Sequence, residues 1–217
     1  MKQLLKDSLV KLGMWFPETN IDSLLYFWKL LTDYNKNVNL ISRNTTDTNG
    51  FIAHIVDSLC PMIFPFPTNL TYMDLGSGGG LPAIPLKIVR PGWKTVLVES
   101  TGKKAKFLKM ATEKLDLQDT TVLNLFLDFN TVLNPCEFDL ITTRGFATLD
   151  FIIPRITKFL HQGSYFLYYT AKNGVQEIKQ SQTKFILQKY NLVIDSAIDF
   201  SLPFIERFRA LILFRKL

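Results

Sequence analysis

The chain has 217 residues, of which 47% are hydrophobic and 20% charged, so it is long enough to bury one sizeable core. Its formal net charge of +6 favours polyanionic partners and anionic cofactors without excluding any class of enzyme. Lys and Asp interrupt the apolar residues at the start, which argues against a signal peptide. No apolar run approaches the ~18 residues that span a bilayer, which argues against a membrane protein. The sequence therefore predicts a cytoplasmic protein.

The first part of the chain predicts helices. One face of a first helix carries Leu4, Leu5, Leu9 and Leu12. Apolar residues at i, i+3, i+4 and i+7 mark a second helix over residues 21–34, and a third is expected over residues 51–62. The proline-rich residues 64–67 predict an extended linker. We therefore expect residues 1–67 to form a helical extension packed on a core of residues 68–217.

The core alternates short apolar runs with helical stretches. Strands are expected at residues 70–75, 95–99, 121–125, 138–142, 164–169, 193–200 and 208–214. Helices are expected at residues 81–89, 103–115, 149–160 and 175–189. This alternation predicts a parallel sheet with helices on both faces. Only a turn around Pro203 separates the last two strands, so they should form an antiparallel hairpin at one sheet edge.

A glycine-rich loop follows the first predicted strand directly, with the sequence Asp74-Leu-Gly-Ser-Gly-Gly-Gly80. Glycines allow a sharp turn and bring backbone N–H groups against a ligand, and the next helix N-terminus suits an anionic group such as a carboxylate. A dinucleotide fingerprint needs a glycine where Leu81 stands. The spacing and Asp74, which suits an ammonium, favour S-adenosylmethionine instead. Predicted cofactor contacts in the loop are Asp74, Gly76, Ser77, Gly78 and Gly80.

Two more acids stand at the ends of the next strands. Glu99 ends the second strand, where a carboxylate can accept from both ribose hydroxyls of a nucleoside. Asp128 follows the third, where it can accept from an adenine amino group or be an ordinary solvated loop acid. Together with the loop they predict an α/β protein with the Rossmann-like class I fold of S-adenosylmethionine-dependent methyltransferases. That fold has a seven-stranded, mostly parallel sheet with an antiparallel last strand, here with an N-terminal helical appendage.

The sequence after the fourth predicted strand restricts which kind of atom could accept the methyl group. It reads Thr142-Thr-Arg-Gly145, without the Asn/Asp-Pro-Pro-Tyr clamp of exocyclic-amine methyltransferases. Pro135-Cys136 precedes the strand and is interpreted as a turn, not as a cytosine-methylating nucleophile. A ring nitrogen with a free lone pair, such as guanine N7, needs neither group and is compatible with the sequence.

Basic residues follow several strand ends. Arg144 ends the fourth strand, where it could contact cofactor or an RNA phosphate or be a plain surface residue. The helix after Glu99 carries four lysines, which form either a solvated face or a phosphate-binding surface. They are Lys103, Lys104, Lys106 and Lys109. Further candidates are Lys172, Arg207 and Arg209. Two cysteines and two histidines in no metal-like spacing predict that no metal is bound.

Over residues 25–217 the chain resembles the glucose-inhibited division protein B (GidB) family, bacterial methyltransferases that place a methyl on guanine N7 of small-subunit (16S) ribosomal RNA. The similar segments are residues 34–42, residues 54–58, the glycine loop with its Leu-Pro and Ile-Pro-Leu, residues 99–108, residues 138–149 and Glu206-Arg207. The resemblance implies S-adenosylmethionine as cofactor and small-subunit ribosomal RNA as substrate. The small size of the chain favours RNA within the assembled or assembling subunit, and free RNA stays open as the substrate. We expect a monomer.

The resemblance also implies roles for individual residues. Cofactor contacts would be Gly76, Leu81, Leu127, Asp128 and Arg144, with Glu99 at the ribose. Arg144 and Arg207 match arginines of catalysis or RNA binding, and His54 and Asp57 match a helix that caps the site. The expected substrate contacts are His54, Lys103, Lys172, Arg207 and Arg209. Without the resemblance, His54 is a structural helix residue.

Two other hypotheses stay open. A small-molecule methyltransferase on the same core would have a closed, aromatic-lined pocket beside Gly76 and Arg144. A cofactor-binding ribosome-assembly factor with weakened catalysis is suggested by Ala53 and Phe126, which stand where the family usually has arginine.

Overall fold

The computed structural model describes residues 1–127, 137–145, 147–170 and 181–217. The expected contacts at Asp128 and Lys172, the turn at Pro135-Cys136 and the first residues of the helix expected at 175–189 lie outside these ranges. In the part of the chain that is described, no helix is both long and apolar enough to cross a membrane.

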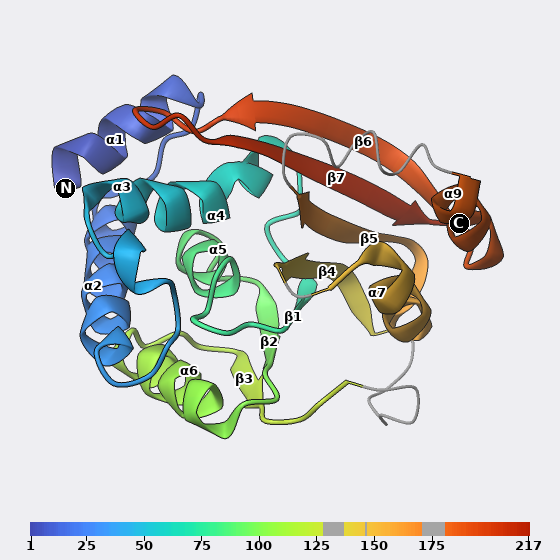
Figure 1. Ribbon diagram of the computed structural model, residues 1–217, viewed down its shortest axis with the longest axis horizontal. Coiled ribbons are helices and arrows are strands. Elements are labelled where there is room, and N and C mark those ends of the chain that lie inside the picture. The colour runs from blue at the N-terminus through green and yellow to red at the C-terminus, as the bar shows by residue number, and fades with distance from the viewer. Residues whose placement is uncertain (128–136, 146, 171–180) are drawn as a thin grey trace.

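One seven-stranded sheet organises the molecule, in the strand order β3-β2-β1-β4-β5-β7-β6 (Figure 1). The strands are β1 (Thr71–Leu75), β2 (Lys94–Val98), β3 (Thr120–Leu123), β4 (Phe138–Arg144), β5 (Leu160–Thr170), β6 (Leu192–Ser201) and β7 (Phe208–Lys216). β1 to β5 pair in parallel, and β7 lies antiparallel between β5 and β6. The predicted fold class, with its closing antiparallel hairpin, is confirmed.

The helices of the core are α5 (Ala83–Val89), α6 (Gly102–Lys114), α7 (Leu149–Ile156) and α9 (Ser181–Lys189). Where the predicted bound lies in the described residues, the observed bound is within one residue of it, with two exceptions. α5 starts later than predicted because the chain is still turning through Pro82, which is its N-cap. The helix predicted to reach residue 160 stops at Ile156, and Pro154 within it lacks the N–H that would donate to the preceding turn. A short 3-10 turn over Thr157–Phe159 then leads into β5, which is longer than predicted.

Helices also form most of the chain before β1. α1 (Lys2–Lys11) and α2 (Glu18–Asn35) match the two apolar patterns. The third predicted helix is a composite of α3 (Thr48–Phe51), a π-helical turn over Ile52–Val56, α4 (Asp57–Leu59) and a 3-10 turn over Cys60–Ile63. Single π-helical turns inside a helix are rare and are frequently found at functional sites.

The sheet residues alternate between two hydrophobic clusters, as the pleat requires. One face presents Tyr72, Leu97, Leu140, Leu167 and Leu211 to a cluster that includes residues of α1 to α6. The other presents Met73, Val98, Ile141, Phe166 and Ile212 to α7 and α9. Figure 1 shows the N-terminal helices grouped on the side of the molecule away from α7 and α9. The N-terminal helices therefore share the core of the sheet.

The strand order creates a switch point between β1 and β4. From β1 the chain proceeds to β2 and β3 on one side, and from β4 it proceeds to β5 on the other. Ligands of such sheets bind outside the carboxyl ends of the strands at this point. Because β7 is antiparallel, its first residues lie at this same edge, where Thr170 pairs with Ala210.

The segment after α2 is fixed beside the glycine loop by Asn35. Its side chain is 2% exposed, and its Oδ1 accepts from the N–H groups of Leu40 at 2.8 Å and Ile41 at 3.0 Å. Leu40 in turn packs so closely on Gly79 that a Cβ there would lie 3.4 Å from the Leu40 Cβ. The Asn35 amide thus positions one wall of the loop.

We expect Asn35→Ala to lower the free energy of unfolding by about 1–3 kcal/mol, because it leaves two buried N–H groups without an acceptor. Urea denaturation measures the change. Asn37→Ala is the matched control, since Asn37 is exposed, and should shift stability by less than about 0.5 kcal/mol. Equal effects of the two substitutions would contradict this role.

Candidate functional site

The glycine loop is held against the end of β2. The N–H groups of Gly76 and Ser77 both donate to the Val98 carbonyl, at 2.9 and 3.0 Å. Gly76, Gly78 and Gly80 have φ values of +73°, +52° and +79°, a region that residues with a side chain rarely adopt. The three glycines therefore let the loop reverse within a few residues and leave its backbone close to the carboxyl ends of β1 and β2.

Glu99 braces this loop, a role that its position in the sequence does not reveal. It is 6% exposed, and its Oε2 accepts from the Gly78 N–H at 2.8 Å. Its Oε1 accepts from the Thr101 N–H at 2.7 Å, at the start of α6. Each carboxylate oxygen can accept a second hydrogen bond, so ribose hydroxyls still have an acceptor. Glu99 can therefore join the loop, α6 and a bound nucleoside.

Asp74 lies at the end of β1 with one carboxylate oxygen unpaired. It is 1% exposed, and its Oδ1 accepts from the Thr142 hydroxyl at 2.5 Å. Thr142 has one proton to donate, so the Tyr72 hydroxyl, 2.7 Å away, donates to Thr142. Asp74 Oδ2 is buried without a partner in the described part of the chain. An unpaired buried acceptor at this edge fits a cationic group of a ligand, such as an ammonium.

Burial raises the pKa of Asp74 to about 7, although the hydrogen bond from Thr142 opposes the shift. The carboxyl group is therefore poised to ionise near neutral pH and to gain from an adjacent positive charge.

The other residues expected to contact the cofactor lie in different surroundings. The Ser77 hydroxyl donates to the Asp74 carbonyl at 3.0 Å, so it is turned toward the backbone. Leu81 and Leu127 are 9% and 3% exposed and pack in the two hydrophobic clusters. Lys103 is exposed in the first turn of α6.

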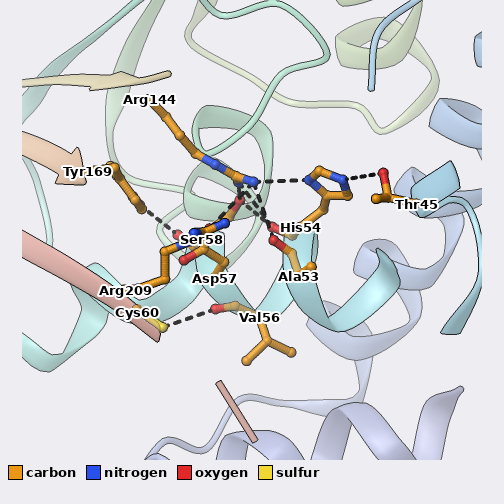
Figure 2. A network of polar contacts seen from close by, with 10 residues as sticks. All are labelled: Thr45, Ala53, His54, Val56, Asp57, Ser58, Cys60, Arg144, Tyr169 and Arg209. Carbon is orange, nitrogen blue, oxygen red and sulfur yellow. Dashed lines mark hydrogen bonds and ion pairs between the residues drawn. The ribbon is translucent and has the colours of Figure 1, made fainter. Parts of the chain in front are cut away.

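Arg144, at the end of β4, reaches across to the composite helix (Figure 2). Its Nη1 donates to Ser58 Oγ at 3.1 Å, and its Nη2 donates to the Ala53 carbonyl at 3.3 Å and to His54 Nδ1 at 3.0 Å. Asp57 Oδ2 lies 3.4 Å from Nη2 and also accepts from Arg209 Nε at 3.2 Å. One buried carboxylate thus holds guanidinium groups from the end of β4 and the start of β7.

His54 orients Arg144 and has both ring nitrogens engaged. A guanidinium has no acceptor, so Nδ1 accepts from Arg144 and the ring proton sits on Nε2. Nε2 donates to Thr45 Oγ1 at 2.9 Å, whose own proton goes to the Ser42 carbonyl at 2.8 Å. Burial, with the charges of Arg144, Arg207 and Arg209, lowers the pKa of His54 to about 3. His54 therefore stays neutral and is a poor general base.

A cavity of about 220 Å³ opens beside this network, lined by Asp57, Arg144, Gly145, Tyr169, Thr170 and Arg209. It lies at the ends of β4 and β5, where Arg144 pairs with Tyr169. Arg207 lies nearby in the turn before β7, and burial together with Arg209 lowers its pKa. The predicted residues His54, Arg144 and Arg209 are thus brought together. Tyr169 and Ser58 were missed, although their positions at a strand end and one turn after His54 were available signals.

The chain matches the family model GidB, rRNA small subunit methyltransferase G, over residues 20–198. Proteins named ribosomal RNA small subunit methyltransferase G are similar to it. The one from Syntrophus aciditrophicus is 29% identical, over 99% of this chain and 89% of that protein. The one from Lactobacillus acidophilus is 31% identical, over 89% and 81%.

Solved structures share the fold at low identity. Pyrococcus horikoshii TYW2, in complex with MeSAdo, has a TM-score of 0.59 and 14% identity, over 75% of this chain and 62% of that one. A SAM-dependent methyltransferase from Aquifex aeolicus has a TM-score of 0.58 and 12% identity, over 78% and 94%.

The two histidines of the chain should titrate differently, which NMR of the imidazole nitrogens can measure. His54 should remain a neutral Nε2–H tautomer down to about pH 5, because its pKa is lowered to about 3. His161 is an internal control, since its contacts with the Gln162 carbonyl and with Asp139 raise its pKa above 6.5. A His54 imidazole that titrates near its ordinary pKa would contradict the network.

Proposed function

Because the chain belongs to the GidB family of rRNA small subunit methyltransferase G proteins, we propose that it methylates N7 of a guanine in small-subunit ribosomal RNA, with S-adenosylmethionine as methyl donor. We further propose that it acts as a monomer in the cytoplasm, on RNA within the assembled or assembling subunit. The observation that carries the proposal is the polar cavity at the ends of β4 and β5, where Arg144, Arg209 and Asp57 meet.

The residues at the ends of β1 and β2 support the choice of cofactor. The unpaired Asp74 Oδ2 suits the methionyl ammonium, Glu99 suits the ribose, and the backbone of the glycine loop and α5 suits the carboxylate. When bound, S-adenosylmethionine supplies a methyl group on a sulfonium, an electrophile that a lone pair can take directly. The chain's own residues then need only hold the acceptor in line and exclude water.

The chemistry of the cavity supports an acceptor that loses no proton. His54 already accepts from Arg144 at Nδ1 and donates at Nε2, and Asp57 is paired with two arginines. Because both of its ring nitrogens are engaged, His54 is not free to remove a proton from an amine or a hydroxyl. Guanine N7 carries a lone pair and no hydrogen, so its methylation requires no base, and the positive charge that develops on the ring remains there.

The alternatives receive less support from the site. A small-molecule methyltransferase was expected to have a closed, aromatic-lined pocket, but the described lining has one aromatic ring, Tyr169, beside charged groups. Loss of catalysis was suggested by Ala53 and Phe126. Arg144 uses the carbonyl of Ala53, which any residue would supply, so this substitution leaves the arginine held in place.

The direct test is transfer of labelled methyl from S-adenosylmethionine to small ribosomal subunits that lack the modification. We expect label in 7-methylguanosine after nuclease digestion. Arg144→Met should reduce the rate about 100-fold or more, because it removes the guanidinium that lines the cavity and helps to hold the acceptor in line. Arg215→Met is the control, since Arg215 pairs with Asp195 at the opposite end of β7 and its side chain is 43% exposed. Label in another nucleoside, or equal loss in both variants, would refute the proposal.

The affinity for S-adenosylmethionine should fall as the pH drops, because only ionised Asp74 attracts the ammonium. With a pKa of about 7, most Asp74 carboxyls are ionised at about pH 7.5 and about one in ten at about pH 6. We expect several-fold weaker binding at the lower pH by calorimetry, and weak, pH-independent binding for Asp74→Asn.

The raised pKa of Asp74 gives the stability of the ligand-free protein a pH dependence opposite to that of cofactor affinity. Between pH about 4 and 7 the folded, ligand-free protein keeps a proton that the unfolded chain has lost, so this group lowers stability as the pH rises.

Cofactor affinity that is equal at both pH values would contradict the assignment of Asp74 to the ammonium.

A further inference from the structure

Asp57 lines the cavity and carries one carboxylate oxygen without a hydrogen-bond partner among the described residues. The residue is 0% exposed, and its Oδ2 serves both Arg144 and Arg209. Its Oδ1 is also buried and has no hydrogen-bond partner in the ranges that the structure describes. Leaving a buried carboxylate oxygen unpaired is costly. A ligand that enters the cavity with N–H donors would remove this cost.

The charges around the cavity restrict what that ligand can be. Arg144 and Arg209 offer only donors, with side chains 15% and 21% exposed, whereas Asp57 offers only an acceptor. A simple anion would be repelled by Asp57, and a simple cation by the arginines. The complementary ligand presents an acceptor directly beside N–H donors. Guanine does so on one edge, with O6 next to N1–H and the N2 amino group, whereas adenine presents a donor at N6 and an acceptor at N1.

We propose that this cavity binds the target guanine by its Watson–Crick edge, with Asp57 accepting from N1–H and the N2 amino group and an arginine donating to O6. The inference rests on the proposed function and names the residue that selects the base. Asp57 is thereby a specificity-determining residue in addition to the residue that holds Arg144.

The place and size of the cavity agree with this orientation. The cavity lies at the ends of β4 and β5, and the glycine loop follows β1 on the other side of β4. A guanine whose N1 edge faces Asp57 directs its opposite, imidazole side, which carries N7, away from Asp57. The volume of about 220 Å³ is below the ~300–1,000 Å³ of pockets for drug-sized ligands, which suits one base.

Entry of the base requires that a side chain at the rim of the cavity moves away from Asp57. Asp57 Oδ1 is closed to solvent in the ligand-free protein, so a side chain at the rim has to move. Arg209 is the candidate, because its recorded contact with Asp57 is a single Nε hydrogen bond of 3.2 Å and its side chain is partly exposed. Arg144 is held by four other groups of the composite helix and stays in place.

The test titrates the full chain, saturated with S-adenosylhomocysteine, with the 5′-monophosphates of guanosine, inosine, adenosine and xanthosine. We expect the wild type to bind guanosine monophosphate about tenfold more tightly than the inosine nucleotide, which lacks the N2 amino group, and more tightly still than the adenosine nucleotide. This arm needs no variant, so it does not depend on how a substituted protein folds.

Asp57→Asn then distinguishes base reading from a merely structural role. The amide oxygen has two lone pairs, one for an arginine and one for N1–H of the base, while the amide N–H groups stand where the carboxylate accepted from the N2 amino group. We expect it to lose affinity for guanosine monophosphate about tenfold or more and to prefer xanthosine monophosphate, which has a carbonyl at C2. Asp195→Asn, which removes a charge on β6 that pairs with Arg215 at the opposite end of β7, should keep the wild-type preference.

The inference is overturned if the wild type binds the guanosine and adenosine nucleotides equally or binds neither, or if Asp57→Asn loses affinity without gaining the xanthosine preference. Methyl transfer to small subunits is measured on the same preparations. Transfer to guanine N7 without nucleotide selectivity would overturn this inference and leave the proposed function standing. Selectivity without transfer would support the base pocket and refute the proposed function.

Discussion

The carboxylate of Asp57 joins parts of the chain that are far apart in sequence. It lies on the composite helix before the sheet, and it holds Arg144 from the end of β4 and Arg209 from the start of β7. Removing one member of a buried ion pair typically costs about 3–5 kcal/mol, because the remaining charge is left without a partner. The two ion pairs therefore stabilise the arrangement in which the N-terminal helices, β4 and the β6–β7 hairpin meet at one edge of the sheet. The cavity exists because these parts meet there.

Glu99 and Asp74, at the ends of β2 and β1, have different roles because their carboxylates have different hydrogen-bond partners. Glu99 accepts backbone N–H groups at both oxygens, which fastens the glycine loop to α6. Asp74 is equally buried, but one of its oxygens has no partner in the described chain, and its pKa is raised to about 7. A satisfied acid organises the protein, whereas an unsatisfied one is available to a ligand. The same contrast separates the two oxygens of Asp57.

Much of the fold could be predicted because each step had a local cause. Alternating apolar runs and helices predicted the parallel sheet, and the turn at Pro203 predicted the closing hairpin. Pro154 marks the last turn of α7 in the sequence, whereas the apolar pattern alone extends to residue 160. The π-helical turn over Ile52–Val56 had no such signal, because a pattern of apolar residues does not distinguish it from a continuous α-helix.

The site was predictable as a set of residues but not as a set of contacts. Positions at strand ends identified Asp74, Glu99 and Arg144, since parallel strands bring their carboxyl ends to one edge. The bracing of Gly78 by Glu99 and the engagement of both His54 nitrogens depend on distances between segments that periodicity does not give. The resemblance suggested His54 as a substrate contact, which stays a prediction, and the structure adds that its imidazole accepts from Arg144.

The central claim is that these groups serve methylation of guanine N7 in small-subunit ribosomal RNA. Its most direct test is nucleoside mass spectrometry of small-subunit RNA from cells that lack the gene, with and without complementation by the wild type or by Arg144→Met. The account predicts a loss of one 7-methylguanosine per small subunit, restored by the wild type and not by the variant. An unchanged 7-methylguanosine content in the cells that lack the gene would contradict it.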